Sequence, residues 1–89
     1  MNNRVYVGNV NFQTTEDGVR ELFAPYGEVT SVRMITDRDT GRFRGFLFVE
    51  MATGEQAEAA IAALDGTELD GRPLKVNMAR ERQPRYEDR

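Results

Sequence analysis

The chain has 89 residues, the size of one small domain with little room for an enclosed active site. It is 39% hydrophobic and 30% charged, which is typical of a soluble globular domain. It contains no cysteine and no histidine, which excludes disulfides, cysteine-based metal sites and the commonest general base. No segment reads as a secretory signal or a membrane span, so a cytoplasmic location is the default expectation.

The net charge of −3 argues at first against a polyanionic partner, but the charges are segregated along the chain. Segments 16–28 and 53–70 hold nine of the 15 acidic residues and only one of the 12 basic residues. Because the local sign of charge steers association more than the total does, the remaining segments can still present a positive surface.

The first half of the chain predicts two strands separated by a helix. Residues 4–10, "RVYVGNV", alternate apolar and polar positions as a strand does. Residues 14–27 predict a helix capped by Thr15, with apolar residues at helical spacing and Pro25 and Gly27 at its end. Residues 28–36, "EVTSVRMIT", predict a second strand with Val32 and Met34 inward and Arg33 and Ile35 outward.

The second half predicts a further strand, a helix and a last strand. In "RGFLFVEM" (44–51), Leu47, Val49 and Met51 point to one face and Phe46 and Phe48 to the other. Residues 53–66 predict a helix, with Thr53 and Gln56 spaced as a capping box and Gly66 as its stop. After a turn at Asp70-Gly71, the last strand points Leu74, Val76 and Met78 inward and Lys75, Asn77 and Ala79 outward.

The element order is strand, helix, strand, strand, helix, strand, which predicts a two-layer α+β sandwich. Residues 1–79 form the predicted domain, and residues 80–89 are charged, without periodicity, and predict a mobile tail. Two such helices cover only one face of a four-stranded sheet. The acidic segments are mainly the helices, so the open face is expected to be the positive side.

The open face collects aromatic and basic side chains. Tyr6, Phe46 and Phe48 lie on it, together with Arg4, Arg33, Arg44, Lys75 and Asn77. Exposed rings flanked by cations suit single-stranded nucleic acid, because bases stack on the rings and arginines meet phosphates. Gly8 lies on the same face and is expected to leave room for a base or ribose.

These residues resemble the RNA-recognition motif (RRM) family. "RGFLFVEM" is similar to its long ribonucleoprotein motif and "VYVGNV" to its short one, at the expected separation within residues 4 to about 80. Leu47 and Met51 depart from the usual residues of the long motif but point to the core. The body resembles small single-RRM proteins of bacteria and plants, without their glycine-rich tail.

The resemblance implies a ferredoxin-like sandwich with an antiparallel sheet in the order 4-1-3-2. It implies that Tyr6 and Phe48 stack bases, that Phe46 packs on a ribose and that Arg44 bridges a phosphate. Lys75, Asn77, Ala79 and Arg80 match positions that often contact a base edge in the family. Arg33 faces the same surface, and Glu50 is expected near the edge of the site or against Arg33.

The expected function is therefore non-catalytic binding of single-stranded RNA, in post-transcriptional regulation or RNA chaperoning, without cofactor or metal. Single-stranded DNA stays open as a ligand, and a monomer is the default. An enzyme of similar topology would need a glycine-rich, arginine-bearing turn after the first strand, which "NVNFQTT" does not provide. The alternative is an RRM-like fold that mainly binds proteins, through its acidic helical face. Phe12 and Phe23 are expected in the core.

Overall fold

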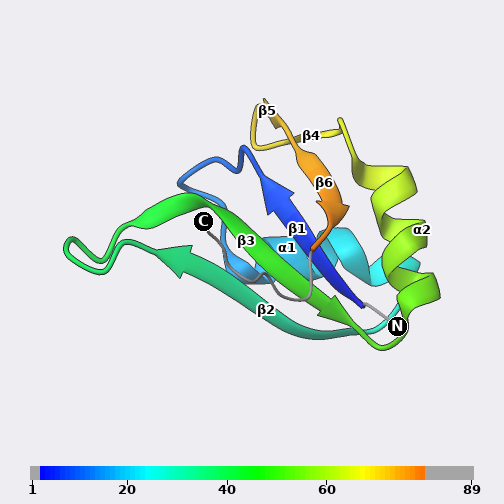
Figure 1. The fold of residues 1–89 in the computed structure, drawn as a ribbon. Helices are drawn as coiled ribbons and strands as arrows, with labels where there is room; N and C mark the ends of the chain where they lie inside the picture. Colours follow the sequence, from blue (N-terminus) through cyan, green and yellow to red (C-terminus); the bar gives the residue numbers. More distant parts are fainter. Residues whose placement is uncertain (1–2, 80–89) are drawn as a thin grey trace, which may run out of the picture.

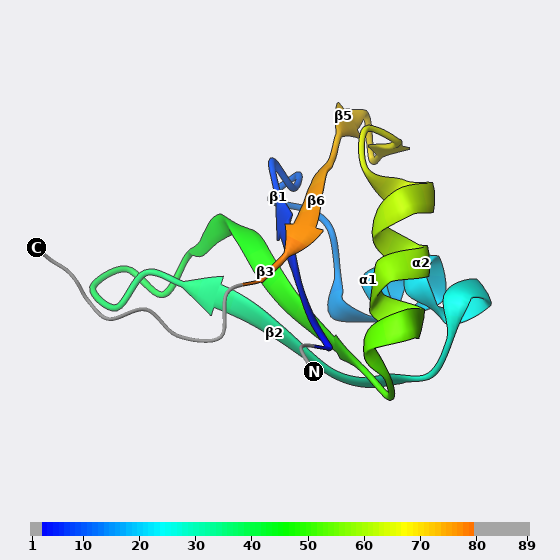
Figure 2. The same cartoon turned by 45° about the vertical axis from the view of Figure 1, so that its right-hand side comes forward.

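Four strands pair into one antiparallel sheet in the order β2-β3-β1-β6, as the resemblance implied (Figure 1). The computed structural model describes residues 3–79. The sheet strands are β1 (Arg4–Gly8), β2 (Val29–Thr36), β3 (Phe43–Met51) and β6 (Lys75–Met78). The helices are α1 (Glu16–Phe23) and α2 (Gly54–Leu64), and a 3-10 turn (Ala24–Tyr26) follows α1. Both helices lie on one side of the sheet, so the predicted two-layer sandwich is confirmed (Figure 2).

The core lies between the sheet and the helices, and the alternation along β3 decides which side chains enter it. Leu47, Val49 and Met51 are completely buried, as their spacing predicts. They pack with apolar residues of both helices and of the neighbouring strands, among them Val5, Val7, Val19, Phe23, Ala57, Ala60, Leu64 and Val76. The two departures from the family pattern, Leu47 and Met51, are therefore core residues and leave the other face unchanged.

Side-chain caps begin both helices. Thr15 Oγ1 accepts a hydrogen bond from Gly18 N–H at 3.1 Å, and Thr53 Oγ1 accepts one from Gln56 N–H at 3.1 Å. The predicted capping box of α2 is only half formed, because the side-chain amide of Gln56 turns to the neighbouring segment instead. Its Oε1 accepts from the N–H of Glu28 at 3.0 Å and so ties the start of β2 to α2.

A short hairpin, formed by β4 (Glu68–Leu69) and β5 (Arg72–Pro73), precedes β6. Its turn at Asp70-Gly71 was predicted and has φ values of 53° and 86°, but its two short strands were not predicted. The hairpin holds the segment between β1 and α1. Asp70 accepts from Thr14 Oγ1 at 2.6 Å through its carboxylate and from Asn11 Nδ2 at 2.9 Å through its carbonyl.

Two predicted side-chain positions are wrong. Phe12, expected in the core, is 68% exposed, because β1 ends at Gly8 and Val10 takes the buried place in the segment that follows. Its ring packs edge-on against Phe43 with centroids 6.2 Å apart. Ala79, expected to face outward, is only 4% exposed; its N–H bonds to Arg4 O at 2.9 Å, which keeps the chain beside β1 after β6 has ended.

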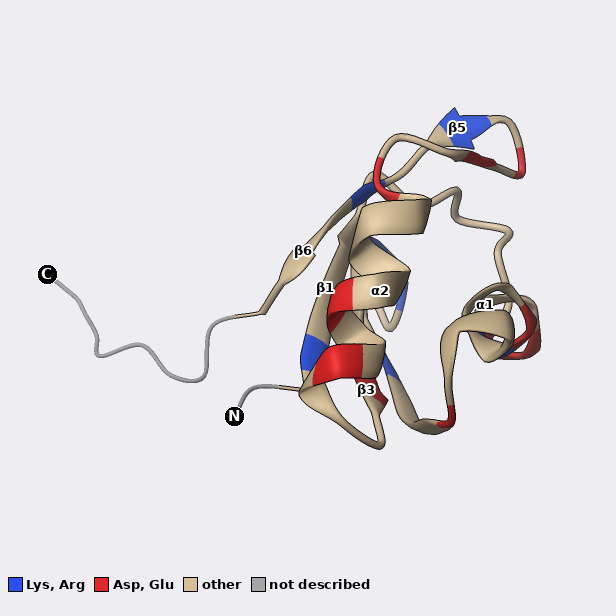
Figure 3. Cartoon of the chain, turned by 90° about the vertical axis from the view of Figure 1, so that its right-hand side faces the viewer, with Lys and Arg blue, Asp and Glu red and all other residues tan. Residues whose placement is uncertain are grey.

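The charges follow the two layers, as predicted from their segregation along the chain. Acidic residues mark both helices, whereas β1 carries a basic residue (Figure 3). Arg80 and the predicted tail lie outside the described residues. Within residues 3–79, neither helix is long and apolar enough to cross a membrane.

Candidate nucleic-acid interface

The strand register arranges the side chains of the open face in rows across the sheet. One row crosses all four strands: Arg33 pairs with Phe48, Phe48 with Tyr6, and Tyr6 with Asn77. The next row joins Ser31, Glu50 and Arg4. Residues that are 44 positions apart in the sequence, such as Arg4 and Phe48, are thereby brought to one surface.

Three aromatic rings form a continuous cluster on this surface, referred to below as the aromatic cluster (Tyr6, Phe46 and Phe48). The ring centroids of Tyr6 lie 5.9 Å from those of both phenylalanines, and the two phenylalanine centroids lie 6.1 Å apart. The rings are tilted or edge-to-face, the arrangements that aromatic quadrupoles favour. Each ring is half-buried against its neighbours, so part of each ring remains exposed to solvent.

Two arginines lie over the rings of the cluster. Arg4 Cζ is 6.0 Å from the Phe48 centroid, and Arg44 Cζ is 5.9 Å from the Phe46 centroid. Both distances are within cation–π range, which concentrates positive charge directly at the stacking surface. A guanidinium so placed can turn away from the ring and donate hydrogen bonds to a phosphate that reaches this surface.

Glu50 is an acidic residue on this surface, and its side chain pairs with Arg4. Its Oε2 accepts from Arg4 Nη2 at 3.2 Å and from Arg4 Nε at 3.3 Å. Of the two expected positions for Glu50, at the edge of the site or against Arg33, the pairing with Arg33 is therefore not found. The reason is the register, since Glu50 pairs directly with Arg4 on β1, whereas Arg33 stands opposite Phe48 on β2. The side chains of Arg4 and Glu50 are 47% and 39% exposed.

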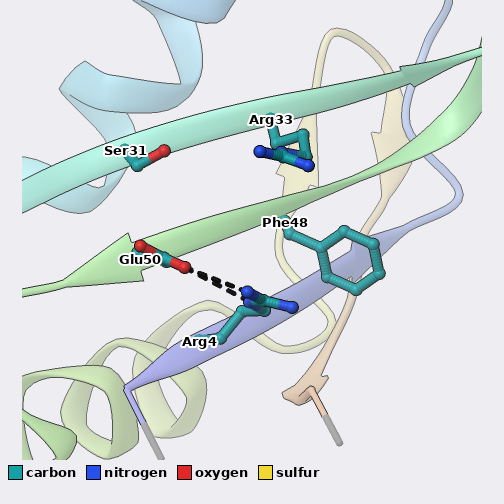
Figure 4. Close-up of a pocket in the computed structure, with 5 residues that line it drawn as sticks. All are labelled: Arg4, Ser31, Arg33, Phe48 and Glu50. Atoms are coloured by element: carbon teal, nitrogen blue, oxygen red, sulfur yellow. Dashed lines mark hydrogen bonds and ion pairs between the residues drawn. The ribbon is translucent and has the colours of Figure 1, made fainter. Parts of the chain in front are cut away.

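A pocket opens beside the aromatic cluster (Figure 4). Figure 4 shows Ser31 and Arg33 on β2 along one side, Phe48 and Glu50 on β3, and Arg4 on β1 at the opposite side. Sequence reasoning missed Ser31. The alternation of β2 could have found it, because position 31 must face the same way as position 33.

Gly8 contributes to the surface in a different way from the one expected. A Cβ at this position would lie 2.5 Å from Tyr6 Oη and 2.9 Å from Tyr6 Cε2. The space above Gly8 is therefore filled by the ring of Tyr6 and is not open to a ligand. Gly8 allows Tyr6 to lie along the sheet, while its pairing partner Lys75 and the nearby Asn77 are exposed on β6.

The loop between β2 and β3 is closed by Asp37. Its carboxylate accepts from the N–H groups of Asp39 at 2.7 Å and Thr40 at 3.1 Å. These two hydrogen bonds hold the pKa of Asp37 below its ordinary value, with a smaller contribution from the charge of Arg44. The loop thus keeps a fixed turn beside the basic end of β3.

The family follows from comparison with known proteins. The profile of the RNA recognition motif matches residues 5–75. The chain belongs to the RNA recognition motif family. The expected ribonucleoprotein motifs of the RRM lie on β1 and β3, the two central strands that carry the aromatic cluster.

Relatives and solved structures agree with this assignment. The protein named "Putative RNA-binding protein RbpE" of Nostoc is 53% identical over 79 residues, which cover 89% of this chain and 80% of that protein. The solved structure of RNA binding protein PG1 is 49% identical with a TM-score of 0.84, covering 90% of this chain and 96% of that one. The RRM of Rna15 with bound RNA (GU) is 30% identical with a TM-score of 0.77, covering 89% and 84%.

Proposed function

We propose that this RRM binds single-stranded RNA, without catalysis, on the face of its sheet that no helix covers. The observation that carries the proposal is the aromatic cluster, whose three centroids lie within 6.1 Å of one another on that face. An ordinary core explains buried rings, but here Leu47 and Val49 already fill the core side of β3. The RRM of Rna15 supports the proposal, since its structure holds RNA.

In this proposal the bases of two successive nucleotides stack on Tyr6 and Phe48, and Phe46 packs against the ribose between them. Each stacked base contributes roughly 1–3 kcal/mol. Arg44 leaves the ring of Phe46 to bond a phosphate, which exchanges a cation–π contact for a charge-assisted hydrogen bond. Lys75 and Asn77 on β6 contact base edges, and Arg80, outside the described residues, is proposed to continue that role.

A duplex fits this surface poorly, because paired bases present edges and not faces to the rings. The acidic helices also repel phosphates that approach from the other side. We therefore propose binding that is selective for single strands and weakened by salt. The chain acts as a monomer in the cytoplasm, in post-transcriptional regulation or RNA chaperoning, and residues 1–79 form its RNA recognition motif.

Fluorescence anisotropy with a short randomised RNA pool tests the proposal. The wild type is compared at low and moderate salt with the Phe46→Ala/Phe48→Ala double variant. Phe12→Ala is the matched control, because Phe12 is also an exposed ring but contacts Phe43 and lies outside the aromatic cluster. Circular dichroism and urea unfolding establish that each variant is folded.

We expect the double variant to lose roughly 2 kcal/mol or more of binding free energy, and the control to bind within a factor of about three of the wild type. Equal binding by the wild type and the folded double variant, or no binding by either, would remove the open face as the RNA site. The alternative function, in which the fold mainly binds proteins, would then be favoured. The same assay with a single-stranded DNA pool decides between RNA and DNA.

A further inference from the structure

The pocket beside Phe48 combines hydrogen-bonding groups of opposite kinds. Glu50 supplies a carboxylate, Arg33 a guanidinium and Ser31 a hydroxyl, and Phe48 closes one end with its ring (Figure 4). The stacking roles proposed above use only Phe48 among these residues. Base stacking therefore does not explain what the polar side chains of the pocket do.

Much of the hydrogen-bonding capacity of the pocket is unused. An ionised carboxylate offers about four acceptor positions, and Arg4 occupies two of them, both on Oε2 of Glu50. Within residues 3–79, Glu50 Oε1 accepts no hydrogen bond, and Arg33 forms no ion pair with an acidic side chain. Arg33 is exposed, so its guanidinium can turn toward a ligand in the pocket.

The ion pair with Arg4 matters for recognition because it fixes the direction of the carboxylate. Two donors of one guanidinium hold Oε2, at 3.2 and 3.3 Å, which leaves Oε1 as the oxygen that is free to meet a ligand. Arg4 also neutralises the charge of Glu50, so that a nearby phosphate is repelled less than by an isolated carboxylate.

A nucleobase that fits such a pocket must donate to the carboxylate on one edge and accept from a guanidinium on another. Guanine donates from N1–H and N2–H on its Watson–Crick edge and accepts at O6 and N7, the pair of atoms that arginine contacts bidentately. Cytosine and adenine offer one exocyclic donor. Uracil has one N–H between two carbonyl oxygens, which would face the carboxylate unfavourably.

We propose that this pocket binds a guanine base that follows the nucleotide stacked on Phe48, and that Glu50 and Arg33 make the site selective. The carboxylate of Glu50 accepts from N1–H and N2–H, and Arg33 donates to the acceptor edge. Ser31 provides an additional hydroxyl at the side of β2. The proposal rests on the RNA-binding function proposed above and adds a base preference that stacking alone cannot give.

Competition anisotropy with four RNA heptamers tests the preference. Each heptamer is oligouridine with G, C, A or U at its centre, so that a preferred base can select its own register on the sheet. The proteins are the wild type, Glu50→Gln and Arg33→Gln, with Glu58→Gln as the matched control. Glu58 is an exposed residue of α2, on the opposite face of the molecule, and its substitution makes the same change of charge.

We expect the wild type to bind the G heptamer about tenfold more tightly than the U heptamer, in line with a good bidentate contact. Glu50→Gln and Arg33→Gln should each reduce that ratio to about threefold or less, while Glu50→Gln keeps or gains affinity for the U heptamer because a negative charge is removed. Glu58→Gln should keep the tenfold ratio.

The outcomes separate the two proposals. If the wild type binds none of the heptamers, the RNA-binding function itself fails. If it binds all four equally, or if Glu50→Gln retains the full preference for G, RNA binding stands and the guanine pocket is overturned. Tightest binding of the C, A or U heptamer would overturn it as well.

Discussion

Arg4 on β1 and Glu50 on β3 form an ion pair on the open face of the sheet, with 3.2 Å between Nη2 and Oε2. The same guanidinium lies 6.0 Å from the centroid of Phe48. One arginine thus contacts both a stacking ring and the acidic residue of the neighbouring pocket. Its position links the two parts of the surface that we propose to contact successive nucleotides.

The ion pair should contribute little to folding stability. Both side chains are about half exposed, and exposed pairs typically contribute about 0.2–1 kcal/mol. Glu50→Gln should therefore change the free energy of unfolding, measured in urea, by less than about 1 kcal/mol. A loss of more than about 2 kcal/mol would mean that the pair is structural, and that binding defects of the variant cannot be read as recognition.

The close approach of Gly8 and Tyr6 predicts a coupled effect on RNA binding. Gly8→Ala should displace the ring of Tyr6, because the added Cβ would lie 2.5 Å from Tyr6 Oη. We expect RNA affinity to fall about three- to tenfold while the domain stays folded, since displacement costs part of one stacking contact of roughly 1–3 kcal/mol.

A double-mutant cycle measured by anisotropy checks this cause. In a Tyr6→Ala background no ring remains to be displaced, so Gly8→Ala should change affinity by less than twofold. An equal loss in both backgrounds would show that Gly8 acts directly on the ligand, as the sequence alone suggested.

Arg44 is predicted to contribute to the salt dependence of binding. If it neutralises one phosphate, Arg44→Ala should reduce the slope of log affinity against log salt concentration by about 0.7, the value for one contact on a single strand. Arg20→Ala is the matched control, because Arg20 pairs with Glu16 at 3.4 Å on α1, away from the open face. Unchanged slopes for both variants would leave Arg44 without a phosphate partner.

The hydrogen bonds to Asp37 predict how its carboxyl titrates. Asp39 and Thr40 N–H bonds favour the ionised form, so its pKa in the folded protein lies below the ordinary value of 3.8. Because the folded pKa is the lower one, the stabilisation is present above that ordinary value and is lost as the pH falls through the folded pKa. A carbon-13 NMR titration of the carboxyl should give a midpoint below 3.8, and a midpoint at or above it would contradict the loop geometry.

The alternation of β3 made much of the fold and of the site predictable. Leu47, Val49 and Met51 could only be core residues in a strand, which left Phe46 and Phe48 for the other face. The pairing of residues on strands that are distant in the sequence was harder to predict. Nothing local to Glu50 indicates that Arg4, and not Arg33, stands beside it, because that depends on which residues of three separate strands are paired.

The two wrong burial predictions share a physical cause, which is that periodicity does not describe what happens after a strand ends. Phe12 lies past the end of β1, in a segment held by the β4–β5 hairpin, and its hydrophobicity alone suggested the core. Ala79 lies past the end of β6, where a backbone hydrogen bond to Arg4 sets its position. The positions of such short segments are set by tertiary contacts, which the local sequence pattern does not contain.

An NMR titration is the most direct way to find out whether RNA contacts the open face of the sheet. Backbone amide spectra of the labelled protein are recorded while a short single-stranded RNA is added. We expect shifts concentrated on the four strands β1, β2, β3 and β6, around Tyr6, Arg33, Phe46, Phe48 and Asn77, with α1 and α2 nearly unchanged. Shifts concentrated on the helices, with β1 and β3 unaffected, would contradict the proposed contact.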